Sequence, residues 1–111
     1  MFTRTKQGAV DVIAGTDPLN VDYVDDAAGV IDDCLSSGPA RIVVDMRQIP
    51  LLDSAGLELL LSLHDRCVER GGMLHLAGPS PLCRDILEVT GVISHFDVFS
   101  DPVDAAGSFA Q

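Results

Sequence analysis

Apolar and polar positions along the chain follow two different periods, which mark different kinds of element. "VDVIAG" at 10–15 alternates and ends at a glycine, which indicates a strand, and residues 2–6 are its candidate partner across a turn at Gln7-Gly8. "RIVVD" at 41–45 is a continuous β-branched run, which is typical of a strand buried on both faces. "MLHLAG" at 73–78 and "HFDVF" at 95–99 predict two further strands.

Helical spacing fills the segment between the second and third predicted strands. Its apolar positions are Val24, Ala27, Ala28, Ile31, Cys34 and Leu35. Asp17 or Asn20 is the expected cap, and Gly38-Pro39 is the expected stop. Gly29 lies inside this helix at a cost of about 1 kcal/mol relative to alanine, which suggests close packing against a neighbour.

A second helix is predicted from about residue 54, and Gly71-Gly72 ends it. Its apolar face consists of Leu57, Leu60, Leu61, His64, Cys67 and Val68. A third helix is predicted between a Ser80 cap, with Pro81 in the first turn, and a stop at Gly91. "DPVDAAGSFA" at 101–110 predicts a short closing helix.

Strands that alternate with helices imply parallel strands joined by right-handed crossovers. We therefore expect one α/β domain spanning residues 1–111. The expected sheet is mostly parallel, with one antiparallel strand at its N-terminal edge, and about four helices flank it.

The charge of the chain narrows the choice of partners. It carries 17 acidic against 7 basic residues, a formal charge of −10, which opposes binding to nucleic acid or to anionic lipid. Residues 17–33 carry six aspartates and no base. This acidic face either serves solubility or steers the protein toward a basic partner surface.

The cysteines and histidines give no sign of a metal or cofactor site. Cys34, Cys67 and Cys83 are far apart with apolar neighbours, which favours buried thiols over disulfides. The three histidines form no cluster with the spacing that zinc needs. The sequence also has no Gly/Lys loop that would bind a phosphate, so we expect neither a metal nor a cofactor.

No run of apolar residues approaches the roughly 18–20 that a spanning helix needs, and "MFTRTKQG" lacks the apolar core of a signal peptide. We therefore expect a cytoplasmic protein without membrane insertion. The oligomeric state stays open, and the polar surface is compatible with a monomer.

The start of the second helix carries the candidate chemistry. In α/β folds, ligands and partners meet the loops beyond the carboxyl ends of the strands, and residues 46–53 leave a buried strand at that edge. Asp53 is expected to cap the helix, which leaves Ser54 exposed in the first turn. The alternative is that Asp53 and Ser54 both serve only to cap the helix. Gly56 costs helix stability but removes a side chain beside Ser54, which would let a partner approach the hydroxyl.

A catalytic serine is not supported by this pattern. A nucleophile needs a base within hydrogen-bond reach and an oxyanion hole, and the chain has no GxSxG elbow. Asp53 is the adjacent residue and is poorly aimed to act as a base, so no enzyme is expected. A modifiable serine fits better, because a phosphate would add about −1.5 to −2 charges and bulk at a docking edge.

The segment from "VVDMRQIPLLDSAGLELLL" through "MLHLAG" and "LEVTGV" resembles the STAS domain of bacterial anti-sigma-factor antagonists. The resemblance covers about residues 41–106. It implies that Ser54 is phosphorylated by a serine kinase that is also the anti-sigma factor. The unphosphorylated protein binds that kinase and releases the sigma factor, and a serine phosphatase reverses the mark.

The resemblance also implies a set of partner-binding residues. They are Asp17, Asp53, Ser54, Ala55, Gly56 and Leu57. Asp17 is either the counterpart of an acidic contact residue in the family's "GxLD" element or a plain helix cap. Gly56 and Leu57 belong either to the docking rim or to helix packing.

STAS domains also occur as constitutive interaction subunits of lipid-transport or stress-sensing complexes, and this second function remains an alternative. The serine in the D-S-x-G-L pattern favours the phosphoswitch, because a purely structural module does not need that hydroxyl.

Overall fold

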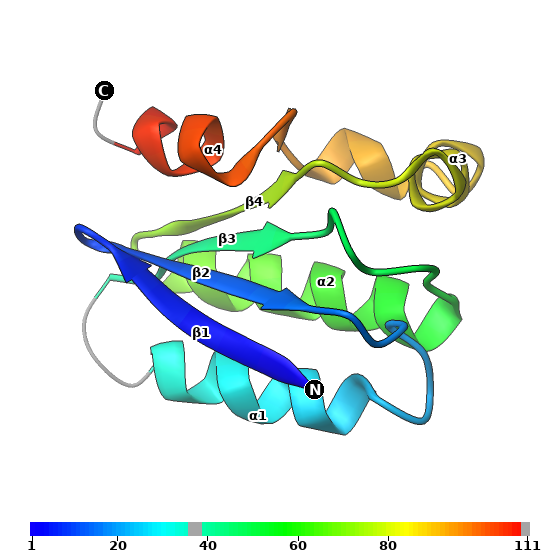
Figure 1. Cartoon of the computed structure of the whole chain (residues 1–111). Coiled ribbons are helices and arrows are strands. Elements are labelled where there is room, and N and C mark those ends of the chain that lie inside the picture. The colour runs from blue at the N-terminus through cyan, green and yellow to red at the C-terminus, as the bar shows by residue number, and fades with distance from the viewer. Residues whose placement is uncertain (36–38, 110–111) are drawn as a thin grey trace.

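Strands and helices alternate along the computed structural model, which describes residues 1–35 and 39–109 (Figure 1). The strands are β1 (Phe2–Gln7), β2 (Val10–Gly15), β3 (Arg41–Asp45), β4 (Met73–Ala77) and β5 (Val98–Phe99). The helices are α1 (Val24–Leu35), α2 (Ser54–Glu69), α3 (Pro81–Val89) and α4 (Pro102–Ser108), with a 3-10 turn η1 (Val92–His95).

The strands form one sheet in the order β1-β2-β3-β4-β5. β1 runs antiparallel to β2, and every other neighbouring pair is parallel. The β1–β2 turn contains Gly8 with a φ of 62°, a backbone conformation that favours glycine. The expected α/β fold, with a parallel sheet and one antiparallel N-terminal strand, is confirmed.

Helices cover the two faces of this sheet unequally (Figure 1). α1 and α2 lie together on one face, where they pack in a large core with Ile42 and Val44 of β3. α4 lies on the opposite face, where its Ala105 packs with Val43. All three central residues of β3 are therefore buried, as its β-branched sequence predicts.

α1 begins later than expected. It starts at Val24, so neither Asp17 nor Asn20 is the residue directly before it. Asn20 instead opens a turn that leads into the helix. Its side-chain oxygen accepts from Asp22 N at 3.0 Å, and its carbonyl accepts from Val24 N at 2.9 Å. Gly38, part of the expected stop, lies outside the described residues.

Two expectations about helix packing are wrong. Gly29 is exposed, and a Cβ built on it would meet no atom within 4 Å, so no neighbour packs closely there. Val68 is 50% exposed, whereas Leu63 is buried in its place on the inner face of α2. The buried stripe of α2 therefore runs through Leu60, Leu63 and Cys67.

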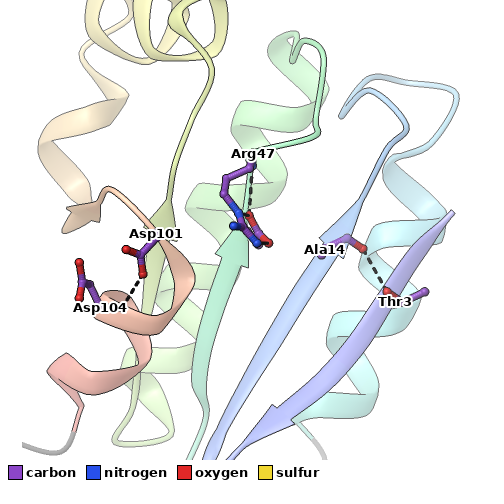
Figure 2. A network of polar contacts seen from close by, with 6 residues as sticks. Thr3, Ala14, Arg47, Asp101 and Asp104 are labelled. Atoms are coloured by element: carbon purple, nitrogen blue, oxygen red, sulfur yellow. Dashed lines mark hydrogen bonds and ion pairs between the residues drawn. The ribbon is translucent and has the colours of Figure 1, made fainter.

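The last predicted strand is shorter than expected. Gly91 has a φ of 76°, and the four residues that follow it wind into η1, which brings Val92 and Phe96 into the core. Only Val98 and Phe99 then pair with β4. The predicted closing helix is present as α4, where the Asp101 side chain caps Asp104 N at 2.9 Å (Figure 2). Ala110 lies outside the described residues.

Candidate functional site

The candidate site lies on the segment that joins β3 to α2. The segment starts at Asp45, whose carboxylate holds Arg47 by three hydrogen bonds. Arg47 donates from its backbone N at 3.1 Å, from Nε at 3.0 Å and from Nη2 at 2.9 Å. Figure 2 shows the Arg47 guanidinium folded back onto the end of β3. The two bonds between the guanidinium and the carboxylate fix the direction in which the loop leaves the sheet.

Asp53 caps α2 as the sequence predicts. Its Oδ1 accepts from Ala55 N at 2.9 Å and from Gly56 N at 3.2 Å. Its backbone is extended, with φ −119° and ψ −167°, as in other N-cap residues. The carboxylate thus satisfies two of the free amides of the first turn and lies at the positive end of the helix dipole.

Ser54 is the first residue of α2, and it is exposed. Its hydroxyl makes no hydrogen bond with another residue in 1–35 or 39–109, so it is neither engaged in capping nor activated by a base there. The expected division of roles is confirmed in this respect: Asp53 caps the helix, and the Ser54 hydroxyl is open to solvent.

Gly56 is a glycine because of a contact inside the molecule. A Cβ on this residue would lie 2.2 Å from the Leu19 carbonyl oxygen and 2.9 Å from Leu19 Cβ. The same carbonyl accepts from Asp53 N at 3.1 Å, and Leu19 N donates to Leu51 O at 3.0 Å. The glycine therefore allows the β2–α1 loop to cross directly over the first turn of α2.

This crossing brings two loops to one edge of the sheet. The β2–α1 loop contributes Val21 and Tyr23, and the β3–α2 loop contributes Leu51. These three apolar side chains are 70%, 37% and 39% exposed. Sequence reasoning missed them because they lie outside the periodic stripes of the helices. Apolar residues in polar loops were the available signal.

The six residues of the expected partner-binding set differ in exposure. Ser54 is exposed, and Asp17, Asp53 and Ala55 are half-buried. Gly56 and Leu57 are buried and support the helix start from within. Asp17 lies on the β2–α1 loop, where it forms an ion pair with the amino group of Met1. The structure thus brings five of these residues together at the start of α2 and places Asp17 on the adjoining loop.

The family of the chain follows from a direct match. The STAS domain family model matches residues 5–105, and the chain belongs to this family. A curated relative, "Putative anti-sigma factor antagonist BtrV" of Bordetella bronchiseptica, is 29% identical over 75 residues. That alignment covers 68% of this chain and 65% of the relative, so the chain matches slightly under two thirds of the relative's length.

Solved structures with the same fold come from proteins of different kinds. An anti-sigma-factor antagonist (STAS) domain protein from Planctomyces limnophilus has a TM-score of 0.88 at 23% identity, covering 99% of this chain and 98% of its own. The phosphorylated form of the Bacillus cell fate determinant SpoIIAA has a TM-score of 0.75 at 19% identity, and the match covers 98% of this chain and 99% of the SpoIIAA chain. A sulfate transporter family protein from Wolinella succinogenes has a TM-score of 0.76 at 24% identity, and the match covers 96% of this chain and 88% of the Wolinella chain. At these identities the likeness shows the fold alone.

The described residues are also informative about a membrane span and a metal site. None of the helices there has the length and apolar character needed to cross a membrane. Residues 1–35 and 39–109 also contain no group of three or more His, Cys, Asp or Glu side chains arranged to hold a metal ion. The three cysteines are free and buried, as expected.

Proposed function

We propose that this protein is an anti-sigma-factor antagonist that acts by partner switching. With a free Ser54 hydroxyl it binds a serine kinase that is also the anti-sigma factor, and that kinase phosphorylates Ser54 to end the interaction. A serine phosphatase restores the binding form. The observation that carries this proposal is the exposed, unengaged Ser54 hydroxyl at the start of α2, in a chain of the STAS family.

The geometry supports a switch that acts at the surface. A phosphate on Ser54 would lie at the positive end of α2, which favours it, and next to the Asp53 carboxylate, which opposes it. Because these effects partly cancel, the fold itself need not change. The added charge and bulk instead meet whatever partner covers Ser54.

The partner surface that we propose surrounds this serine. Its apolar part is formed by Val21, Tyr23 and Leu51, and its polar part by Asp17 and Asp53. The contact between Leu19 and Gly56 fixes the position of the β2–α1 loop relative to the β3–α2 loop beneath this surface. A switch needs phosphorylation to cost about 3–4 kcal/mol of binding, which weakens affinity several-hundred-fold. A phosphate enclosed by an apolar interface and adjacent to the Asp53 carboxylate costs free energy through desolvation and like-charge repulsion, and these costs reach several kcal/mol.

The proposal is tested by affinity capture from the native cytoplasm. The baits are the wild type, Ser54→Ala and Ser54→Asp, and retained proteins are identified by mass spectrometry. We expect a serine-kinase-like ATPase on the wild type and Ser54→Ala but not on Ser54→Asp. Ser62→Asp is the matched control, because it adds the same charge to an exposed position of the same helix. It should retain the kinase.

Other outcomes of this capture would contradict the proposal. One unrelated partner held equally by all four baits would make the protein a constitutive interaction subunit, the second function considered above. Incubation of the purified protein with the captured kinase and ATP then locates the phosphate. Stoichiometric phosphorylation that persists in Ser54→Ala would refute the assignment of the phosphoacceptor.

A further inference from the structure

A pocket of about 300 Å³ lies at the other end of the molecule, between the sheet and α4. Its residues come from the β1–β2 turn, from the first residues of β2 and β3, and from the last turns of α4. Those residues are Gln7, Gly8, Ala9, Val10, Arg41, Ala106 and Phe109. Ser54 follows the carboxyl end of β3, whereas Arg41 begins that strand, so the pocket is separate from the proposed phosphorylation site.

Sheet register forms the floor of this pocket. Gln7 pairs with Val10 across β1 and β2, and the pairing of Asp11 with Ile42 places Val10 beside Arg41. Gln7, Val10 and Arg41 therefore stand in a row across three strands, on the face that α4 covers. Ala106 of α4 and Phe109, the residue that follows α4, provide the apolar wall above this row.

Arg41 is the charged group of the pocket. Four other arginines of this acidic chain form ion pairs, namely Arg4, Arg47, Arg66 and Arg84. Arg41 makes no ion pair or hydrogen bond with another residue in the described part of the chain. Arg41 is exposed, so the pocket combines apolar walls with one unpaired guanidinium that is open to solvent, the arrangement that complements an anion with an apolar tail.

We propose that this pocket binds a small amphipathic carboxylate. The carboxylate pairs with Arg41, with the Gln7 amide beside it, and the apolar tail lies against Val10, Ala106 and Phe109. The volume is at the lower end of the range for small-molecule sites, which limits the ligand to a short chain. A ligand that touches both the sheet and α4 would also stabilise the packing of that helix.

The proposal is tested on the whole protein by an NMR titration of the amide signals with sodium octanoate. We expect saturable shifts at Val10, Ala106 and Phe109 with a Kd of about 1 mM or tighter. Sodium acetate, which has the charge without the tail, and 1-octanol, which has the tail without the charge, should each bind at least about tenfold more weakly.

Two variants and a matched control locate the site. Arg41→Gln should weaken octanoate binding about tenfold or more, because it removes a charge-assisted hydrogen bond. Ala106→Leu should abolish binding by filling the pocket. Arg84→Gln should leave it unchanged, because Arg84 lies on α3, and α3 contributes no residue to the lining of the pocket.

Three results would overturn the proposal. The first is the absence of saturable shifts with octanoate in a wild-type protein that gives a folded spectrum. The second is equal binding of octanoate by the wild type and Arg41→Gln. The third is a concentration-dependent dimer that shifts the same amides without ligand, since a second copy of the chain would then occupy the groove.

Discussion

Gly29 and Gly56 are both helix glycines, Gly29 inside α1 and Gly56 in the first turn of α2, but the structure places them in opposite environments. A Cβ at Gly56 would meet the Leu19 backbone at 2.2 Å, whereas a Cβ at Gly29 meets nothing within 4 Å. We expect Gly56→Ala to lower the free energy of unfolding by about 1–3 kcal/mol, because the loop above it must move. Gly29→Ala is the matched control and should raise that free energy by about 0.5–1 kcal/mol.

Urea unfolding of the two variants measures both effects. The Gly56→Ala variant should also bind the captured kinase more weakly, because the displaced loop carries Val21 and Tyr23. Equal stability of Gly56→Ala and the wild type would show that the β2–α1 loop does not rest on α2 as the structure has it.

Asp53 is the second residue whose role can be tested separately from the phosphorylation of Ser54. Asp53→Ala removes the acceptor for two backbone amides and should cost about 1 kcal/mol of stability. Asp53→Asn should lose much less stability, because asparagine also caps well. Thermal unfolding distinguishes the two variants. A similar loss in both would show that the negative charge at the helix end, rather than the cap hydrogen bonds, provides the stabilisation.

The cap at Asp53 and the exposure of Ser54 were predictable because both follow from local rules about helix starts. The reason for Gly56 was not, since it depends on Leu19, a residue far away in sequence that meets α2 only in the folded chain. Arg47 was missed for a similar reason. Its bonds to Asp45 depend on how the loop turns back, and no periodic pattern encodes that turn.

At the scale of elements, α4 is held to the sheet partly through a buried histidine. His75 of β4 is 5% exposed, and its ring stacks on Phe109 at 4.3 Å and lies 5.2 Å from Phe99. Its Nδ1 has no hydrogen-bond partner among the described residues, and Asp97 lies 3.9 Å from that atom. Burial lowers the pKa of His75, and His64 lowers it further, although Asp97 opposes the shift.

This lowered pKa sets the direction of a pH effect. The folded protein binds the His75 proton less readily than the unfolded chain, so the neutral side chain stabilises the fold fully above the unfolded pKa of about 6.5. That stability is lost as the pH falls from there toward the folded pKa. We expect His75→Phe to reduce the loss on acidification, as measured by urea unfolding at a series of pH values.

His95→Gln is the control for this experiment, because His95 is exposed at the end of η1. It should retain the pH dependence of the wild type. If His75→Phe and the wild type lost stability equally between pH 7 and pH 5, another group would have to carry the effect.

Elements with strong periodicity were predictable, and elements defined by a change of direction were not. β3 has the expected bounds, and α2 and β4 begin where expected, because burial on both faces or on one stripe leaves a repeating pattern. The segment after Gly91 is apolar enough for a longer strand, but η1 turns it to bury Val92 and Phe96. A local sequence pattern does not show which apolar residues of a short segment will be buried in the tertiary core.

At the scale of the whole molecule, the charge of −10 predicts how partner binding responds to salt. If the partner surface is basic, attraction between the two proteins speeds their association, and salt screens that attraction over roughly 8–10 Å at physiological ionic strength. The acidic segment on α1 lies next to the β2–α1 loop, so its field acts at the proposed partner surface. We therefore expect the association rate with the kinase to fall as salt rises.

Neutralising part of this segment tests whether its electric field or direct contacts determine the rate of association with the kinase. Asp22→Asn with Asp25→Asn removes two exposed charges near the Ser54 edge and should lower the association rate and flatten its salt dependence. Asp104→Asn, on α4 across the sheet, should change either quantity much less. Surface plasmon resonance at several salt concentrations measures the association rate and its salt dependence. If the affinity is independent of salt, or if all variants behave alike, the acidic surface serves solubility only, and apolar contacts around Leu51 carry the recognition.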